Sequence, residues 1–431
     1  MRFHLHTVTI GILGWALFIT PAMAQSSVMG IDYGTDFFKV ALAAPSKNLD
    51  IVLNRDYKRK TQSQVLVNDL VRHYGVDADS KFVRMTDKMY PAVKSILGRL
   101  FSDPSCATYR ERYNNGMVED PERHTPLFRQ TDEVAYTPEQ ILAMQLQYAR
   151  ETATSEAGHL VSKAVITVPP FFDQFERQAV LDAADLAGVR AIALVNDGSA
   201  VAYTYAMGKT FAKPQNVLFY DVGAGSTTAT LVKLGTNPKD DSTLVSMKSF
   251  GYDRTLGGFE IDVRLQKHLG DLFMKKFGDK LKGSVFDSPR ALVKLLKEAH
   301  RVKHILSANT EAMSSIEGLE GHDFKVQVTR EELENLTQDL VPRFTKPIDD
   351  ALNSAKLTLK DVDTVVLVGG GVRIPFILNL LESHVGEGKI AKSVNGDEAA
   401  VMGATLYAAS LTIPLRGKKL ILRDMAPYPV E

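Results

Sequence analysis

The chain has 431 residues, of which 45% are hydrophobic and 24% are charged. A chain of this length and apolar content can bury a large core in two or more lobes, which excludes an intrinsically disordered protein. The formal net charge is zero, with 51 basic and 51 acidic residues, and Cys106 is the only cysteine, so a polybasic nucleic-acid or membrane-surface binder, an intrachain disulfide and a CxxC site are excluded.

The N-terminal segment has the three-part form of a secretory signal. Arg2 precedes an apolar run from Val8 to Ile19, and Ala22-Met23-Ala24 forms a cleavage site before Gln25. The run is short for a membrane span, which needs about 20 apolar residues. The sequence therefore predicts a signal peptide over residues 1–24, with an uncleaved anchor as the alternative, and no other membrane span.

Strands and helices alternate through the first half of the chain. Residues 28–42 predict two strands around a turn at Asp32-Tyr33-Gly34. Thr137 to Gln140 is a capping box that begins an apolar-periodic helix. Residues 165–168 predict a buried strand, and a helix follows from about Gln174 to Gly188. This order is typical of an α/β fold with helices covering the sheets.

The second half continues the same alternation. Residues 217–220 predict a buried strand, and Ser288-Pro289 begins a long basic helix. Thr329 to Glu332 is a second capping box. Residues 365–368 predict a strand that leads into a glycine-rich turn, and residues 395–409 predict a nearly apolar helix. The sequence therefore predicts an α/β protein along its whole length.

One short pattern occurs twice. Gly30–Thr35 and Phe219–Ser226 each contain an apolar strand, an Asp, an apolar residue, a Gly and a hydroxyl residue. A single turn of this kind is typical of an ordinary hairpin. Two of them, so far apart in the chain, predict a duplicated domain, with one hairpin turn from each lobe facing a shared cleft.

These turns have the chemistry of a phosphate site. Glycine lets backbone N–H groups approach a phosphate, and the hydroxyls of Thr35, Ser226 and Thr227 can donate to phosphate oxygens. The carboxylates of Asp32 and Asp221 suit Mg²⁺, which is bound through carboxylate oxygens and retained water. Together, the two turns predict a site for a phosphate group and a divalent cation.

A third glycine loop strengthens this interpretation. Gly369, Gly370 and Gly371 follow a strand and precede a helix, so they permit the close approach of a flat nucleoside. Arg373 can stack its guanidinium on a base. Lys303, His304 and Ser307 lie on one edge of the basic helix, and the alternative for them is a solvated cationic face.

With these motifs, the chain resembles the nucleotide-binding domain of the heat shock protein 70 chaperones, within the actin and sugar-kinase ATPase superfamily. The resemblance extends from Val28 to about Val430, and three segments look most like the large lumenal class, the large glucose-regulated or Lhs-type chaperones: Asp173–Arg177, Gly251–Gly258 and Leu306–Asn309. The motifs that carry the family resemblance are Gly30–Thr35, Ile166–Pro169, Asp221–Ser226, Gly251–Gly258, Gly369–Pro375 and Asn395–Ala400.

The resemblance implies an actin-like ATPase fold, with two duplicated lobes around a nucleotide cleft. It implies lobe I over residues 25–210, lobe II over 211–391, a return helix of lobe I over 392–415, and an interdomain linker with the start of a missing substrate-binding domain over 416–431. ATP or ADP is expected at the base of the cleft, with Mg²⁺ held through water by Asp32 and Asp221. The cofactor-binding residues implied by the match are Asp32, Gly34, Thr35, Asp221, Gly223, Ala224, Gly225, Ser226, Gly257, Gly258, Lys303, Ser307, Gly369, Gly370, Gly371, Arg373 and Asp397.

Several positions depart from the family pattern. Asp36 stands where the family has a second threonine, and Asp79 stands where it has a cleft lysine. Asp197 stands where the family has Glu, and Thr228 stands where it has Asp. His304 stands where the family has an Arg that stacks on the base. Phosphoryl transfer needs positive charge at the transferring group, so the match implies very slow or absent ATP hydrolysis, with Asp197 and Asp221 as weak catalytic candidates.

The resemblance leaves three functions open. The first is a stress-response protein of the endoplasmic reticulum lumen that serves as co-chaperone and nucleotide exchange factor for a lumenal heat shock protein 70 chaperone. The second is an ATP-hydrolysing foldase or holdase, which would bind unfolded polypeptides only with a further C-terminal domain. The third, a small-molecule kinase, is disfavoured by the secretory signal. The sequon at Asn335-Leu336-Thr337 fits a lumenal location.

Overall fold

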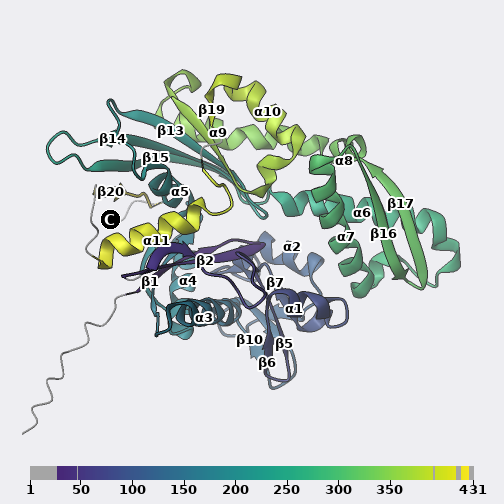
Figure 1. Cartoon of the computed structure of the whole chain (residues 1–431). Coiled ribbons are helices and arrows are strands. Elements are labelled where there is room, and N and C mark those ends of the chain that lie inside the picture. Colours follow the sequence, from purple (N-terminus) through teal and green to yellow (C-terminus); the bar gives the residue numbers. More distant parts are fainter. Residues whose placement is uncertain (1–26, 46, 392–393, 414–418, 427–431) are drawn as a thin grey trace, which may run out of the picture.

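The computed structural model describes residues 27–45, 47–391, 394–413 and 419–426, and Figure 1 shows them folded into two lobes, one above the other. The predicted signal peptide and its cleavage site before Gln25 lie outside the described residues, as does part of the predicted linker over 416–431. Among the described residues, no helix combines the length and the apolar character that crossing a membrane requires.

Lobe I is built on a mixed sheet with the strand order β12-β11-β1-β2-β3, and β4 pairs with β2. The strands β1, β11 and β12 are parallel, whereas β2 runs antiparallel to β1. Every residue of β1 is buried, as expected for a strand with both faces covered. The strands are β1 (Val28–Tyr33), β2 (Phe37–Ala44), β3 (Lys47–Ile51), β4 (Thr61–Gln62), β11 (Lys163–Val168) and β12 (Arg190–Asn196).

Helices cover both faces of this sheet. Below it in Figure 1 lie α3 (Pro138–Ala157) and α4 (Gln174–Leu186), and above it lie α5 (Asp197–Ala206) and α11 (Ala399–Thr412). The predicted capping box of α3 is present, because Thr137 accepts a hydrogen bond from the backbone N–H of Gln140. The helices α5 and α11 therefore lie between the two lobes.

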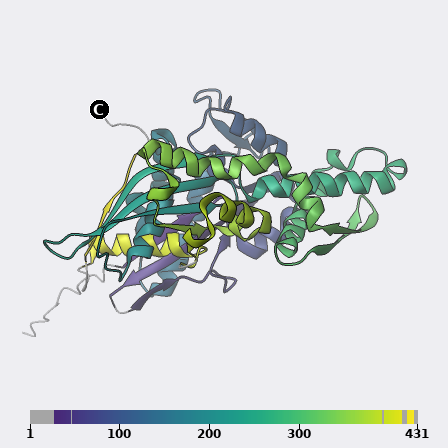
Figure 2. The same cartoon turned by 90° about the horizontal axis from the view of Figure 1, so that it is seen from above.

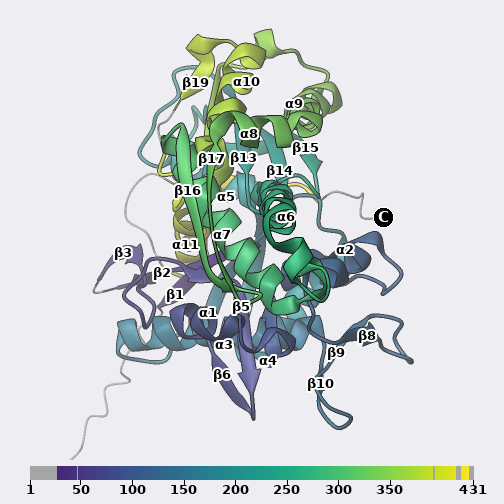
Figure 3. The same ribbon diagram turned by 90° about the vertical axis from the view of Figure 1, so that its right-hand side faces the viewer.

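The outer part of lobe I carries two small sheets, with the strand orders β6-β5-β7 and β10-β9-β8. It lies below α6 and α7 of lobe II in Figure 3. Its elements are β5 (Gln64–Asn68), β6 (Val71–His73), α1 (Gly75–Phe82), η1 (Thr86–Lys88), β7 (Met89–Pro91), η2 (Val93–Ile96), α2 (Pro104–Arg112), β8 (Met117–Glu119), β9 (Pro126–Arg129) and β10 (Ala135–Tyr136).

Lobe II repeats the plan of lobe I with the strand order β19-β18-β13-β14-β15-β20. The strand β13 is antiparallel to β14 and parallel to β18, as β1 is to β2 and β11. The duplicated hairpins that the sequence predicts are therefore present. The strands are β13 (Gln215–Val222), β14 (Thr227–Thr236), β15 (Thr243–Asp253), β18 (Thr364–Val368), β19 (Ile390–Ala391) and β20 (Leu420–Arg423).

The remaining elements of lobe II cover its sheet and form an arm. In Figure 2 the hairpin of β16 and β17 projects to one side of the body together with α6 and α7. Ser288 caps α7, and Thr329 and Glu332 form the predicted second capping box. The elements are α6 (Gly258–Phe277), η3 (Gly278–Lys280), η4 (Val285–Asp287), α7 (Pro289–Ala308), β16 (Glu311–Leu319), β17 (His322–Thr329), α8 (Arg330–Leu336), η5 (Gln338–Leu340), α9 (Val341–Ala355), η6 (Leu359–Asp361), η7 (Gly370–Arg373), α10 (Pro375–Val385) and η8 (Glu387–Lys389).

One segment differs from the sequence predictions, and a second has a structure that they did not specify. The last helix begins at Ala399 rather than at Asn395, because the Asn395 side chain accepts the backbone N–H of Asp397 and closes a turn before the helix. Leu420–Arg423, within the predicted linker, pairs as β20 with β15 at the edge of the lobe II sheet. Asp424 then accepts hydrogen bonds from Asn196 and Ser199, so this segment also contacts lobe I.

Candidate functional site

A cavity of about 450 Å³ opens between the lobes where the two hairpin turns meet. It is lined by most of the residues that the sequence analysis selected. These lining residues are Asp32, Gly34, Thr35, Asp197, Asp221, Gly223, Ala224, Gly225, Ser226, Gly258, Lys303, Ser307, Gly369, Gly370, Gly371, Arg373 and Asp397.

The two hairpin turns have the same hydrogen-bond pattern. The N–H of Gly34 donates to the carbonyl of Phe37 at 3.1 Å, and the N–H of Gly223 donates to the carbonyl of Ser226 at 2.9 Å. A Cβ atom on Gly225 would lie 2.7 Å from Oγ1 of Thr35, so the turn of one lobe packs against the turn of the other. The structure thus brings both predicted turns to one place.

Gly257 supports the lobe II turn from behind and is not part of the cavity lining. A Cβ atom there would lie 2.4 Å from the carbonyl oxygen of Ala224. The next two N–H groups, of Gly258 and Phe259, donate to the carbonyls of Gly223 and Ala224 at 2.9 and 2.8 Å. The start of α6 therefore fixes the turn's carbonyls and leaves its N–H side toward the cavity.

The third glycine loop closes the cavity from lobe II. Gly369 has a φ of +80°, and a Cβ atom there would lie 2.2 Å from Oδ1 of Asp221, so this position requires glycine. A Cβ atom on Gly370 would meet nothing within 4 Å, so this residue faces open space. Arg373 donates to Oδ2 of Asp397 at 2.5 Å, which holds its guanidinium at the cavity edge.

The α7 side of the cavity is less cationic than the sequence suggests. Nζ of Lys303 is buried and donates to Oδ2 of Asp262 at 2.7 Å, so its charge is paired inside lobe II. Burial, with the charges of His300 and Lys303, lowers the pKa of His304 to about 4, and His304 is therefore neutral at pH 7. Ser307 donates to the backbone carbonyl of Lys303 at 2.9 Å.

Three lysines that the sequence analysis missed also line the cavity: Lys39, Lys60 and Lys94. Nζ of Lys39 donates to Oδ2 of Asp32 at 2.8 Å. Nζ of Lys94 donates to the carbonyl of Tyr33 at 2.6 Å and lies 3.9 Å from Oδ2 of Asp197. The base of the cavity therefore contains ammonium groups beside its carboxylates.

The two Mg-side aspartates have different surroundings. Burial acts to raise the pKa of Asp32, but the ammonium groups of Lys39 and Lys94 and the hydrogen bond from Thr167 together outweigh burial and hold that pKa below its ordinary value. Burial, together with the charges of Asp197 and Asp32, raises the pKa of Asp221 to about 7. Lobe I thus holds an ionised carboxylate, and lobe II holds one that titrates near neutral pH.

The residues present fit a divalent cation at Asp221 better than at Asp32. Oδ1 of Asp221 is buried without a hydrogen-bond partner among the described residues, whereas both oxygens of Asp32 accept hydrogen bonds, from Lys39 and Thr167. Within the same residues, no group of three or more His, Cys, Asp or Glu side chains could hold a metal by itself. A cation here would need oxygen ligands from phosphate and water.

Asp79 does not line the cavity of the two glycine turns but an adjacent cavity between the lobes, of about 350 Å³, which shares Thr35 and Asp36 with it. Asp79 lies on α1 and pairs with Lys297 of α7 at 2.9 Å, away from the lining of the 450 Å³ cavity. No lysine of α1 lines the 450 Å³ cavity, whereas Lys94 on η2, beyond the strand β7, does. Asp36 and Thr228 do line the cavity, and burial raises the pKa of Asp36.

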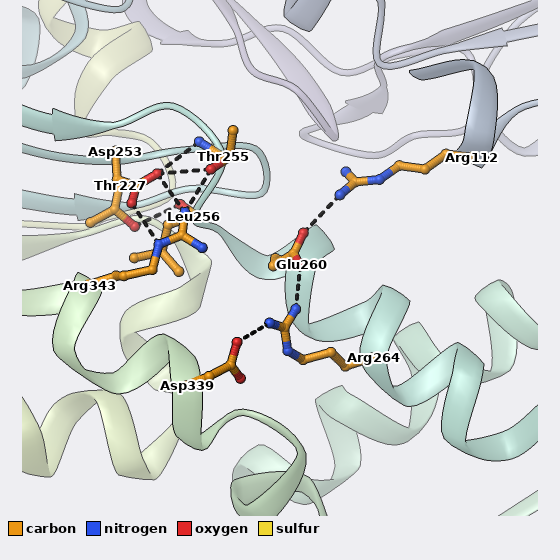
Figure 4. Close-up of polar contacts among 9 residues, drawn as sticks. All are labelled: Arg112, Thr227, Asp253, Thr255, Leu256, Glu260, Arg264, Asp339 and Arg343. Carbon is orange, nitrogen blue, oxygen red and sulfur yellow. Dashed lines mark hydrogen bonds and ion pairs between the residues drawn. The ribbon is translucent and has the colours of Figure 1, made fainter. Parts of the chain in front are cut away.

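Ion pairs join the lobes beside this cavity. Figure 4 shows Arg112 of α2 donating to Glu260 of α6 at 2.8 Å, while Glu260 also pairs with Arg264. In the same view, Arg343 donates to both carboxylate oxygens of Asp253, each at 2.9 Å, and so fixes the turn before α6. The pairs Arg112–Glu260 and Asp79–Lys297 cross between the lobes and hold their outer parts together.

Comparison with known proteins agrees with this architecture. The family model described as Hsp70 protein matches residues 28–431. Similar curated proteins are named Hypoxia up-regulated protein 1. The one from Danio rerio is 39% identical over 431 residues, covering 97% of this chain and 44% of the relative. The one from Xenopus laevis is 40% identical over 413 residues (94% and 64%), and the one from Mus musculus is 37% identical over 433 residues (97% and 43%). The chain therefore spans about half the length of these relatives.

Proposed function

The chain belongs to the Hsp70 family and has its nucleotide-binding, actin-like ATPase fold, and on this premise we propose that it binds ATP and ADP in the inter-lobe cavity. The observation that supports this proposal best is the meeting of two glycine turns and a third glycine loop around one cavity of about 450 Å³. The backbone N–H groups of the turns would hold the phosphates. Mg²⁺ would supply positive charge between Asp221 and the phosphate oxygens.

The nucleoside would lie on the lobe II side of the cavity. Gly370 leaves open space there, and Arg373, Ser307 and neutral His304 lie around it. A neutral imidazole in place of the family's arginine can stack on a base without adding charge. This arrangement supports an adenosine subsite whose affinity comes from stacking and close packing more than from charge.

The wider role that we propose is that of a chaperone-class protein in the endoplasmic reticulum lumen. It would serve as co-chaperone and nucleotide exchange factor for a lumenal heat shock protein 70 chaperone. ATP would favour the closed arrangement of the lobes, because both turns contact the phosphates, and a partner that prefers this form would tighten ATP binding. The name of the similar proteins, Hypoxia up-regulated protein 1, supports a stress-response role.

The binding proposal is tested by titrating the chain with Mg-ATP. Gly370→Val should abolish or strongly weaken binding, since its side chain would enter the space beside the loop. Gly388→Val is the matched control, because a Cβ atom there also meets nothing within 4 Å but lies outside the cavity lining. Binding that survives Gly370→Val unchanged would contradict the cavity assignment.

The exchange proposal is tested by stopped-flow release of a fluorescent ADP analogue from a lumenal heat shock protein 70 chaperone. The chain is added with ATP or without nucleotide, alone and as part of a longer protein that continues as its relatives do. Faster release with the ATP form is expected. If the ATP form of the longer protein does not accelerate release, the exchange role is rejected while nucleotide binding stands.

One observation favours the alternative of an ATP-hydrolysing foldase. Lys94 places an ammonium 3.9 Å from the carboxylate of Asp197, so the cavity has positive charge that the sequence had predicted to be missing. Single-turnover hydrolysis by the parent and by Lys94→Met separates the two functions. A parent turnover of about 1 s⁻¹ that Lys94→Met lowers would favour the foldase. A far slower parent would favour the exchange factor.

A further inference from the structure

The position of Lys39 follows from strand pairing. Lys39 lies directly opposite Asp32 in the antiparallel pair of β1 and β2. Residues paired in this way place their side chains on the same face of a sheet. Because Asp32 faces the cavity, Lys39 must also face it, and its side chain is 16% exposed.

The ammonium of Lys39 has donors to spare. A lysine ammonium has three N–H donors, and among the described residues this one donates only to Asp32, at 2.8 Å. The cavity beside it is lined by both glycine turns, whose N–H groups suit phosphate. The remaining donors of Lys39 therefore lie where a polyphosphate would be bound.

Asp32 is already neutralised by the protein itself. Its Oδ2 accepts from Lys39 at 2.8 Å, and its Oδ1 accepts from Thr167 at 3.0 Å. The matching position in lobe II, opposite Asp221, is Thr228, which brings no charge. One aspartate is thus paired with a built-in cation, and the other has an unpartnered oxygen among the described residues.

We propose that Lys39 is a fixed cation for the nucleotide's polyphosphate, assisted by Lys94, so that this chain binds ATP without a strict requirement for Mg²⁺. The proposal rests on the nucleotide binding proposed above. It assigns Lys39 two roles at once, as the partner of Asp32 and as a donor to phosphate. The divalent cation then adds affinity through Asp221 but is not the only positive charge in the site.

The test compares ATP affinity in excess Mg²⁺ with affinity in EDTA, by isothermal titration calorimetry. The parent should bind in both conditions, with affinities that differ by less than about tenfold. Lys39→Met should weaken binding in EDTA by about 10- to 100-fold, the usual loss for a hydrogen bond to a charged group. The loss of ATP affinity in Lys39→Met should be smaller in excess Mg²⁺, because the cation then neutralises part of the phosphate charge.

The controls separate a phosphate contact from a purely structural ion pair. Lys47→Met removes a lysine of the same sheet that pairs with Glu156 at 2.9 Å on the surface, and it should leave both affinities unchanged. Asp32→Asn/Lys39→Met removes both charges, so it keeps the measurement possible if Lys39→Met alone does not fold. A structural role would change the melting temperature of Lys39→Met without changing the ratio of the two affinities.

Each outcome decides the question. A parent that binds ATP in Mg²⁺ but loses more than about tenfold in EDTA overturns the role of Lys39 and leaves the proposed nucleotide site standing. The same conclusion follows if folded Lys39→Met and the double variant keep the parent's affinity in EDTA. A parent that binds ATP in neither condition overturns both this inference and the proposed function.

Discussion

The hairpins β1–β2 and β13–β14 share one backbone plan but differ in the residue that lies opposite the aspartate. Each places an aspartate at the cavity and a partner across from it on the neighbouring strand, Lys39 opposite Asp32 and Thr228 opposite Asp221. The ammonium keeps Asp32 ionised, whereas Asp221 without one has its pKa raised to about 7 by burial. The duplicated fold thus sets where a carboxylate lies, and the residue across the strand pair sets its charge.

The largest expected effect comes from breaking the lobe I pair. Asp32→Asn leaves the ammonium of Lys39 largely buried with no carboxylate partner. Removing one member of a buried pair costs about 3–5 kcal/mol, so we expect a destabilisation of that size at pH 7.5, measured by urea unfolding. Asp32→Asn/Lys39→Met should recover most of it, and a double variant as unstable as the single one would contradict the pair's importance.

Removing the matching carboxylate in lobe II, that of Asp221, should change the free energy of unfolding in the opposite direction. The carboxyl of Asp221 holds its proton to about pH 7 in the folded chain, but in the unfolded chain it ionises near 3.8. Stability from this group is therefore full below about pH 4 and is lost as the pH rises to about 7. Asp221→Asn has no proton to lose, so in EDTA and without nucleotide it should be more stable than the parent by about 4 kcal/mol at pH 8.

The pH dependence of that difference is the decisive measurement. Urea unfolding at pH 4 should give equal stabilities for the parent and Asp221→Asn, and the difference should grow between pH 4 and pH 7. Asp32→Asn should not show this gain at pH 8. If both variants changed stability in the same direction at pH 8, the two aspartates would not differ in charge as described.

The sequence predicted the parts of this comparison that depend on local pattern. The two Asp-x-Gly turns, the capping boxes at Thr137 and Thr329 and the glycine loop are each encoded within a few residues, because turns and helix starts depend on local hydrogen bonds. Lys39 could have been found from the same pattern by counting the strand pairing across the turn. It was missed because matching to a family compares residue types at aligned positions and passes over an added charge.

Lys94 and Asp79 could not be placed from local pattern. Lys94 reaches the cavity because Ala92 before it adopts a left-handed conformation (φ 52°) and η2 then turns toward β1. That path depends on contacts with residues far away in sequence, such as the hydrogen bond from Ala92 N–H to the carbonyl of Ser63. Asp79 lies on α1 and pairs with Lys297 of α7, which is more than 200 residues away in the sequence.

The two aspartates also differ in how the neighbouring strand supports them. Disturbing this support in lobe II should lower the free energy of unfolding by less than the changes above. In lobe I, Thr167 of β11 donates to Asp32, whereas in lobe II, Gly369 after β18 packs directly against Asp221. Gly369→Ala would force a side chain into a φ of +80° and within 2.2 Å of Oδ1 of Asp221. We expect a loss of about 1–3 kcal/mol in urea unfolding. Gly370→Ala, next in sequence but facing open space, should be nearly neutral, and equal losses would contradict this packing.

The smallest change in stability is expected from removing the ion pair that helps to hold the two lobes, and so the two hairpins, together. Arg112 and Glu260 join α2 to α6 beside the cavity (Figure 4), but both side chains are partly exposed, and pairs of this kind contribute about 0.2–1 kcal/mol. Arg112→Ala should therefore leave global stability almost unchanged. Because the pair crosses between the lobes, its loss should favour their opening and raise the rate of ADP release by up to about fivefold, measured with a fluorescent analogue.

Lys267→Ala removes a pair of similar strength, but Lys267 and Asp271 both lie on α6, so that variant should release ADP at the parent's rate. If both variants release ADP faster than the parent and by the same factor, surface charge and not the contact between the lobes controls release. The two hairpins would then be held together by the packing of Gly225 against Thr35.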